Sequence, residues 1–294
     1  VPLNSSWSDR RGKNTKMKII AKNPGDVQSW LLDNNGEVRG AYSQNGLEAT
    51  LHYKDAGEKD FRVLRKFNVE EEQMLPLAFD YDNKTIYVAS NMGRDKQAIY
   101  KYDPVKDELG EMVFAHDEVD VTGLMMSRKK QKVIGVSYMF KYPEAVYFDK
   151  DTEKLMKGLQ AAFKGKRVNI TSQTDDEMLN IVMVNNDNDP GSYYLYDRKK
   201  RKMTYLVSPM DWLKPEDLVA MKPIEFKSRD GLTIHGYLTL PKGSEGKKVP
   251  LIVNPHGGPY GVRDMWGFNP EHQFFANRGY ATVQVNFRGS GGYG

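Results

Sequence analysis

A repeat of 46 to 48 residues is the feature that most constrains the fold of this chain. Segments of alternating apolar and polar residues begin at equivalent points of the repeat, at Val38, Thr85, Val133 and Leu179. The next segment always ends in aspartate, at Asp55, Asp103, Asp149 and Asp197, with spacings of 48, 46 and 48 residues. Alternation interrupted by turn residues predicts β-strands, so we expect almost no helix before residue 218.

A fourth segment completes each unit after a charged turn. These segments are Phe61–Phe67, Leu109–Ala115, Leu155–Phe163 and Lys202–Ser208. Four strands in about 45 residues is the period of a β-propeller blade. We therefore predict a partial β-propeller of about four blades over residues 1–218, with Lys16–Ala21 as the outer strand of a preceding blade. A β-sandwich with coincidental spacing is the alternative.

The pattern changes near Leu213–Met221. Strands are predicted at Ile224–Lys227, Leu232–Leu240, Val249–Asn254 and Ala281–Asn286. A helix is predicted at Glu271–Arg278, because Asn269 is a good N-cap, Pro270 suits the first helical position and Gly279 suits the position after the last turn. This succession predicts that residues 219–294 form the N-terminal part of an α/β-hydrolase domain.

Two glycine motifs follow the last two predicted strands. In His256-Gly257-Gly258-Pro259, a backbone N–H could serve an oxyanion hole, and glycine would leave room for the oxygen. An ordinary glycine turn is the alternative. Gly289-x-Gly291-x-x-Gly294 matches a dinucleotide fingerprint, but that motif requires a following helix and acidic residue. We favour a glycine-rich loop at the rim of an active site.

Composition excludes several classes of function. The chain has 43 basic and 39 acidic residues, a net charge of +4, which predicts neither nucleic acid nor a membrane surface as partner. No apolar run approaches the ~18 residues of a membrane span. Cysteine is absent, which excludes disulfides and thiolate metal sites. The five histidines include no HExxH motif, so no zinc site or other cofactor is predicted.

Three charged runs are predicted to be turns. Arg128–Lys132 and Arg198–Lys202 fall between predicted strands, where solvated turns are favoured over a phosphate-binding patch. Glu70–Glu72 also lies between strands. It is interpreted as an ordinary loop, the alternative being a site for the free amino terminus of a substrate.

The order of a propeller and an α/β-hydrolase start resembles the prolyl oligopeptidase family of serine peptidases, in its acylaminoacyl-peptidase and dipeptidyl-peptidase-like bacterial branch. The specific part of the resemblance is Asn254–Pro259 together with Val285–Gly294. It implies a peptidase for short peptides, with the propeller restricting access. It further implies that Gly258 donates an oxyanion-hole N–H, that His256, Gly257, Arg288 and Gly289 support the active-site loops, and that no cofactor or metal is needed.

The family's nucleophile lies in a Gly-x-Ser-x-Gly-Gly elbow, and this sequence contains no Gly-x-Ser-x-Gly. Ser290, in Gly289-Ser290-Gly291, is not such an elbow. We therefore expect no catalytic triad residue in the chain, and we expect an internal piece of a longer protein with about 200 further residues after Gly294. A non-catalytic propeller scaffold and an esterase of the same fold are the alternatives. A bacterial periplasmic or cytoplasmic location is left open, with a preference for the periplasm.

Overall fold

The computed structural model describes residues 19–258 and 260–294. The chain divides into two compact units, Val1–Glu71 and Glu72–Gly294, each described here by itself. The predicted boundary at 218/219 lies inside the second unit, which contains both propeller-like sheets and the α/β segment. Of the predicted outer strand Lys16–Ala21, residues 16–18 lie outside the described residues, and Ile19–Ala21 form no strand.

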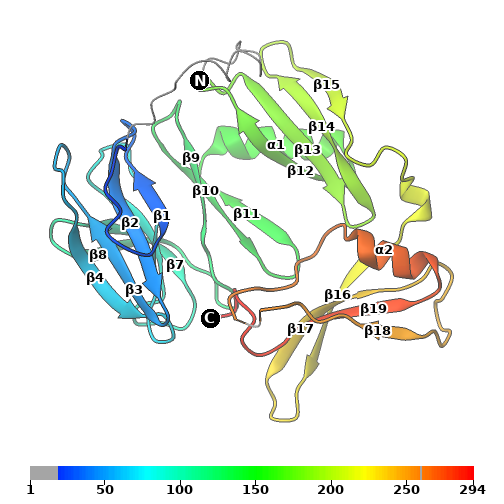
Figure 1. The fold of residues 1–294 in the computed structure, drawn as a ribbon. Coiled ribbons are helices and arrows are strands. Elements are labelled where there is room, and N and C mark those ends of the chain that lie inside the picture. Colours follow the sequence, from blue (N-terminus) through cyan, green and yellow to red (C-terminus); the bar gives the residue numbers. More distant parts are fainter. Residues whose placement is uncertain (1–18, 259) are drawn as a thin grey trace, which may run out of the picture. The chain divides into compact units, whose positions relative to one another are not determined.

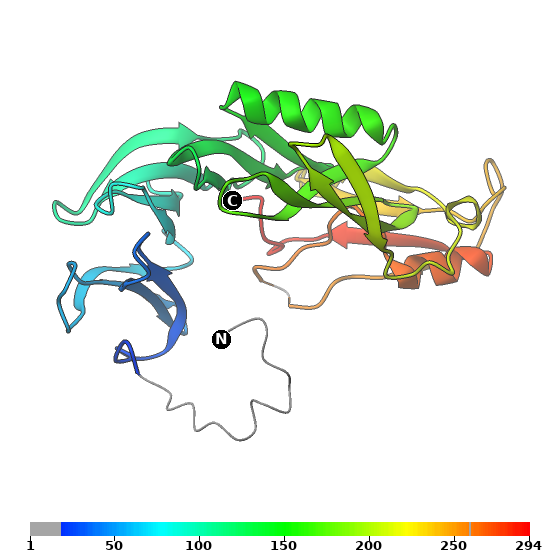
Figure 2. The same ribbon diagram turned by 90° about the horizontal axis from the view of Figure 1, so that it is seen from above.

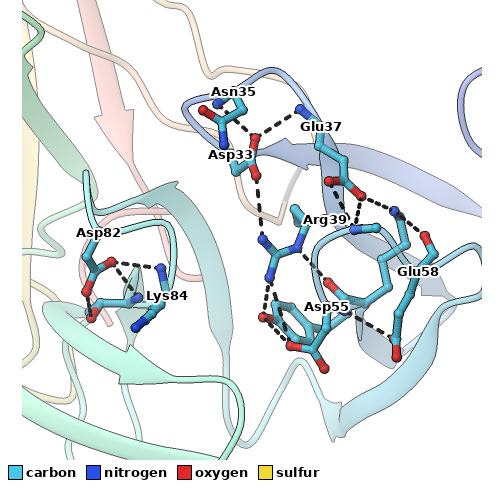
Figure 3. Close-up of polar contacts among 12 residues, drawn as sticks. Asp33, Asn35, Glu37, Arg39, Asp55, Glu58, Asp82 and Lys84 are labelled. Atoms are coloured by element: carbon cyan, nitrogen blue, oxygen red, sulfur yellow. Dashed lines mark hydrogen bonds and ion pairs between the residues drawn. The ribbon is translucent and has the colours of Figure 1, made fainter.

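The first unit contains one antiparallel sheet with strands in chain order (Figure 1). Its strands are β1 (Val27–Leu32), β2 (Val38–Asn45), β3 (Glu48–Tyr53) and β4 (Arg62–Asn68). Figure 3 shows a polar network at one end, where the buried Arg39 guanidinium donates to the Tyr53 hydroxyl at 2.6 Å and the Lys54 carbonyl at 2.8 Å. Asp33 lies 3.5 Å from Arg39, so the buried cation is paired.

Three further sheets in the second unit follow the same up-and-down order. The first has β5 (Met74–Phe79), β6 (Ile86–Ser90), β7 (Ala98–Asp103) and β8 (Glu108–Phe114). The next has β9 (Gly123–Ser127), β10 (Lys132–Met139) and β11 (Pro143–Tyr147), and the last has β12 (Arg167–Gln173), β13 (Leu179–Asn186), β14 (Asp189–Asp197) and β15 (Lys202–Val207). In all four repeats, strands form at the predicted segments that begin at Val38, Thr85, Val133 and Leu179. Strands also form at the predicted segments that lead to Asp55, Asp103, Asp149 and Asp197.

Apolar residues from neighbouring sheets form the core of this region. Tyr87 and Ile99 pack with Val121 and Val136, joining the β5–β8 sheet to the β9–β11 sheet. Ile86, Val88, Val136 and Val184 are buried, whereas Ile134 and Ile181 are only half-buried. Both basic runs form the predicted hairpin turns, at residues 128–131 and 198–201.

The predicted strand Leu155–Phe163 is wrong, because this segment lies in helix α1 (Lys150–Ala162) and its C-cap. Asp149 caps the helix by accepting a hydrogen bond from the Thr152 N–H. Leu155, Met156 and Leu159 have helical spacing and pack on β12 and β13, so the apolar residues cover one face of a helix. Figure 2 shows α1 lying along the neighbouring sheet.

The final sheet mixes antiparallel and parallel pairs. It comprises β16 (Met221–Lys227), β17 (Thr233–Thr239), β18 (Leu251–Val253) and β19 (Ala281–Asn286), in the order β16-β17-β19-β18. A short 3₁₀ turn (Pro215–Asp217) precedes it, and α2 (Pro270–Asn277) connects the parallel strands β18 and β19. Asn269 caps α2 through its side chain, and Gly279 follows with φ +84°, as predicted.

The strand predicted at Val249–Asn254 is shorter than expected and is not covered on both faces. Leu251 is 55% exposed and Val253 is 64% exposed. Leu251 and Val253 share one face of β18, which the described residues leave largely open, whereas Ile252 on the opposite face is half-buried.

Candidate functional site

Two loops meet at one edge of the final sheet. Because β18 and β19 are parallel neighbours, the loops that follow their carboxyl ends emerge on the same side. We call residues 254–258 and 260–262 the HGG loop, and residues 287–294 the RGS loop. Pro259, the last residue of the predicted HGGP motif, lies outside the described residues.

His256 is the side chain that joins the two loops. Its Nε2 lies 2.7 Å from the Ser290 hydroxyl oxygen. Its Nδ1 lies 2.8 Å from the carbonyl oxygen of Gly257. The imidazole also stacks on the Phe287 ring, with 4.5 Å between centroids and 16° between planes. His256 therefore contacts both its own loop and the RGS loop.

The glycines of the HGG loop differ in their surroundings. Gly258 has φ +132°, and a Cβ there would lie 2.5 Å from Cγ2 of Val262. A Cβ at Gly257 would meet nothing within 4 Å. Among the described residues, no acceptor takes the N–H of Gly258. The predicted oxyanion donor therefore has an N–H for which no described residue supplies an acceptor, and its backbone conformation favours glycine.

The RGS loop packs on the HGG loop backbone to backbone. The Gly291 N–H donates to the Val262 carbonyl at 2.9 Å, and a Cβ on Gly291 would lie 2.8 Å from the Gly261 oxygen. Gly289, at φ +89°, lies against the Tyr260 ring. Gly289 is thus placed beside the HGG loop.

Arg288 is not brought to the HGG loop. Its guanidinium forms an ion pair with Asp230 and a 3.4 Å hydrogen bond with the Ser228 hydroxyl, both in the turn between β16 and β17. Any support it gives to the site acts by fixing the start of the RGS loop against that turn. Its predicted supporting role stays a prediction.

The sequence analysis missed Arg263 and Asn286, which hold the RGS loop through Tyr293. The Arg263 guanidinium lies over the Tyr293 ring at 4.1 Å and donates to its hydroxyl at 2.5 Å and to the Met139 carbonyl at 3.1 Å. Asn286 also donates to the Tyr293 hydroxyl, at 2.9 Å. Burial raises the pKa of Tyr293, so the phenol stays neutral. Arg263 belongs to no recognisable sequence motif. Tyr293, within the glycine-rich run, was the local signal that the sequence offered.

The RGS loop also contacts a segment of the propeller-like sheets. The Asp120 N–H donates to the Gly292 carbonyl at 3.0 Å, and the Asp120 carboxylate accepts from the Gln97 N–H at 2.7 Å. Figure 1 shows the C-terminal end of the chain beside the β9–β11 sheet. The candidate site is therefore built from both parts of the second unit.

A buried carboxyl lies behind the HGG loop. Asp264 accepts a hydrogen bond from the Gln284 side chain at 2.5 Å, and its Oδ2 has no partner among the described residues. Burial raises the pKa of Asp264, and the nearby His256 opposes that rise. Asp264 does not hydrogen-bond His256, because the Nδ1 of His256 is occupied by a carbonyl.

Other candidate sites assemble no cluster. Glu70–Glu72 are exposed in the turn before β5. Within residues 19–258 and 260–294, no group of three or more metal-ligating side chains is brought together. Over the same residues, no helix is long and apolar enough to span a bilayer.

Comparison with known proteins yields relatives that are peptidases by name. No protein-family model matches the chain. The chain is 34% identical over 226 residues to dipeptidyl aminopeptidase BIII of Pseudoxanthomonas mexicana, covering 74% of this chain and 32% of that protein. It is 25% identical over 312 residues to dipeptidyl peptidase family member 6 of Caenorhabditis elegans, covering 95% and 42%. The chain thus spans 32% and 42% of these relatives' length, less than half of either.

Solved structures show the same fold. A prolyl endopeptidase structure superposes with a TM-score of 0.66 at 17% identity, over 99% of this chain and 42% of that one. A puromycin-hydrolysing peptidase of Mycobacterium tuberculosis gives a TM-score of 0.64 at 18% identity, over 91% and 43%. The antiparallel sheets that precede β16 are therefore blades of a partial β-propeller, as the repeat predicted.

Proposed function

The chain belongs to the prolyl oligopeptidase family of peptidases, and from that premise we propose that it is part of a serine peptidase that hydrolyses short peptides. The observation that carries the proposal is the junction of the HGG and RGS loops at the carboxyl edge of β18 and β19. There, the Gly258 N–H, which no described residue accepts, lies in a loop that His256 contacts. In this family fold, such an N–H would stabilise the oxyanion of acyl transfer.

In the proposed mechanism, a serine outside this chain attacks the scissile carbonyl, and a histidine serves first as base and then as acid. The Gly258 N–H and the N–H after that serine hold the tetrahedral oxyanion. The proposal is motivated by the absence of a Gly-x-Ser-x-Gly sequence here. The chain's own role is to supply one oxyanion donor and the loops that orient it.

Exposed apolar residues on the final sheet support the proposal that elements outside this chain complete the domain. Leu251 and Val253 lie on edge strand β18 with most of their side chains in solvent. Apolar strand residues of an α/β sheet are ordinarily buried on both faces. Further elements of an α/β-hydrolase domain would cover them. The α/β-hydrolase assignment of residues 219–294 is part of this proposal.

The substrates proposed are short peptides, because a propeller over the active site would exclude folded proteins. Two relatives carry the name dipeptidyl peptidase or aminopeptidase, which makes dipeptidyl substrates the first to test. No metal or organic cofactor takes part in the proposed chemistry.

The test compares this chain with the longer protein that contains it. A fluorophosphonate probe should label no serine in the 294-residue chain and one serine in the longer protein. The longer protein should also hydrolyse fluorogenic dipeptidyl amides. Labelling of Ser290 in the short chain would contradict the proposal. A longer protein with neither labelling nor turnover would favour the non-catalytic scaffold, and turnover of esters alone would favour an esterase.

A further inference from the structure

We propose that Ser290 is a positioning residue that fixes the direction of the Gly258 N–H through the ring of His256. The inference rests on the proposed function of Gly258 as an oxyanion donor. Ser290 itself would touch neither substrate nor reacting atoms. It would act on the peptide group between Gly257 and Gly258 by way of two consecutive hydrogen bonds.

The two partners of the His256 ring define its tautomer. A carbonyl oxygen can only accept a hydrogen bond, so the 2.8 Å contact with Gly257 requires a proton on Nδ1. In the neutral ring, Nε2 is then an acceptor. The Ser290 hydroxyl, 2.7 Å away, must therefore be the donor to Nε2. The Gly257 carbonyl thus sets the tautomer, and the Ser290 hydroxyl holds the ring in the orientation in which Nδ1–H reaches that carbonyl.

The peptide plane between Gly257 and Gly258 links the bonded carbonyl to the proposed donor. In a planar trans peptide, the C=O of one residue and the N–H of the next point in opposite directions. A carbonyl of Gly257 turned toward the imidazole therefore turns the N–H of Gly258 away from it. Two consecutive glycines leave this plane free to rotate at little steric cost. Among the described residues, the imidazole bond restrains the carbonyl end of this plane, and Val262 lies close to its Gly258 end.

Ser290 is held in place between the two loops. Its side chain is buried, with the residue 8% exposed. Its N–H donates to the Phe287 carbonyl at 3.0 Å, and the Phe287 ring stacks on the imidazole that Ser290 contacts. The next residue, Gly291, is bonded to Val262 of the HGG loop. The hydroxyl is therefore held on a closed set of contacts between the two loops.

The same hydrogen bond could be taken for a nucleophile and its base. Two features argue against that reading. In a Ser-His-Asp triad, a carboxylate accepts from Nδ1 and stabilises the imidazolium, whereas here a backbone carbonyl occupies Nδ1. The Ser290 hydroxyl is also buried between the loops, where a substrate carbonyl would have to displace one of them.

The first experiment reads the tautomer directly in the 294-residue chain labelled with ¹⁵N-histidine. Wild type should show His256 as the Nδ1–H form. Ser290→Ala should shift its ring nitrogens toward the averaged values of a tautomer mixture, and Ser290→Thr, which keeps the hydroxyl, should restore the wild-type pattern. Ser244→Ala is the matched control, because Ser244 is equally buried but bonds only the Pro241 carbonyl. Unchanged His256 signals in Ser290→Ala would overturn the proposal, whatever the activity.

The second experiment measures kinetics in the longer protein. Ser290→Ala should lower kcat by about 10-fold, less than the loss of a whole oxyanion donor, while KM changes by less than about twofold. Ser290→Thr should recover most of the rate, and Ser244→Ala should leave kcat unchanged. An unchanged kcat in Ser290→Ala, or fluorophosphonate labelling of Ser290, would overturn the positioning role. An inactive wild type would instead refute the proposed function and leave the tautomer result standing.

Discussion

The two loops of the candidate site need glycine for two different physical reasons. At Gly291 the reason is space, because the Gly261 carbonyl lies where a Cβ would be, at 2.8 Å. At Gly258 the reason is mainly conformation, because φ is +132°, a value that side chains strongly disfavour. Substitution at Gly291 should therefore separate the loops, while substitution at Gly258 should rotate the peptide that carries the proposed donor.

We predict that Gly258→Ala lowers kcat in the longer protein by about 10-fold or more, because one oxyanion donor is displaced. The added methyl group would also meet Val262, so a small loss of thermal stability is expected as well. Steady-state kinetics and the thermal midpoint should be measured together. Gly246→Ala is the control for strain alone, since Gly246 has φ +70° in a turn remote from the loops. A lowered midpoint with unchanged kcat would make Gly258 an ordinary turn glycine.

Among the elements, α1 departs most from the repeat, and Asp149 is the residue that begins it. Its carboxylate accepts from the Thr152 N–H at 2.9 Å and pairs with Lys130 and Lys132. The Lys130 and Lys132 hydrogen bonds hold the pKa of Asp149 well below its ordinary value. One aspartate therefore both caps the helix and ties it to the β9–β10 turn.

We predict that Asp149→Ala destabilises the chain by about 1 kcal/mol, the usual effect of losing an N-cap. Asp149→Asn should lower the free energy of unfolding by less, because asparagine still accepts from the Thr152 N–H. It carries no charge, so it tests the ion pairs with Lys130 and Lys132 separately. A depressed pKa contributes stability that is complete above the unfolded pKa and decreases as pH falls through the folded one. The difference in free energy of unfolding between wild type and Asp149→Asn should therefore become smaller below pH ~4. Urea unfolding at pH 7 and pH 3 measures it, and a constant difference would contradict the ion-pair account.

The sequence predicted the elements whose signals are local. Alternation along Ile86–Ser90 and an N-cap at Asn269 lie within a few residues, so β6 and α2 were found. The helix at Leu155–Phe163 was missed because the repeat register was given more weight than the helical spacing of its apolar residues. His256 and Gly258 could be found from their motif. The bond from His256 to Ser290 could not, because it depends on β18 and β19 becoming neighbours in the sheet.

At the scale of the second unit, the α/β segment is bonded into the sheets that precede it. The Gln273 side chain donates to the carbonyls of Val219 and Asp187, and it accepts from the Val219 N–H at 2.9 Å. Arg263 donates to the Met139 carbonyl, and Asp120 donates to the Gly292 carbonyl. The bonds from Gln273 to Asp187, from Arg263 to Met139 and from Asp120 to Gly292 cross the boundary predicted at 218/219. They are consistent with a compact unit that includes both the preceding sheets and the α/β segment.

We predict, on these contacts, that residues 72–294 fold without residues 1–71, and that residues 219–294 do not fold alone. Cutting at 218 would leave the buried Tyr237 hydroxyl without the Phe140 and Lys141 carbonyls, and would remove the Asp187 carbonyl from the Gln273 side chain. Each unsatisfied buried polar group costs about 1–3 kcal/mol. The segment would also have a small core, which is marginal for a domain of that size. Near-ultraviolet circular dichroism and thermal unfolding of the two pieces provide the measurement. We expect one cooperative transition for residues 72–294 and none for residues 219–294. A cooperative transition of residues 219–294 alone would mean that the boundary at 218/219 is the true one.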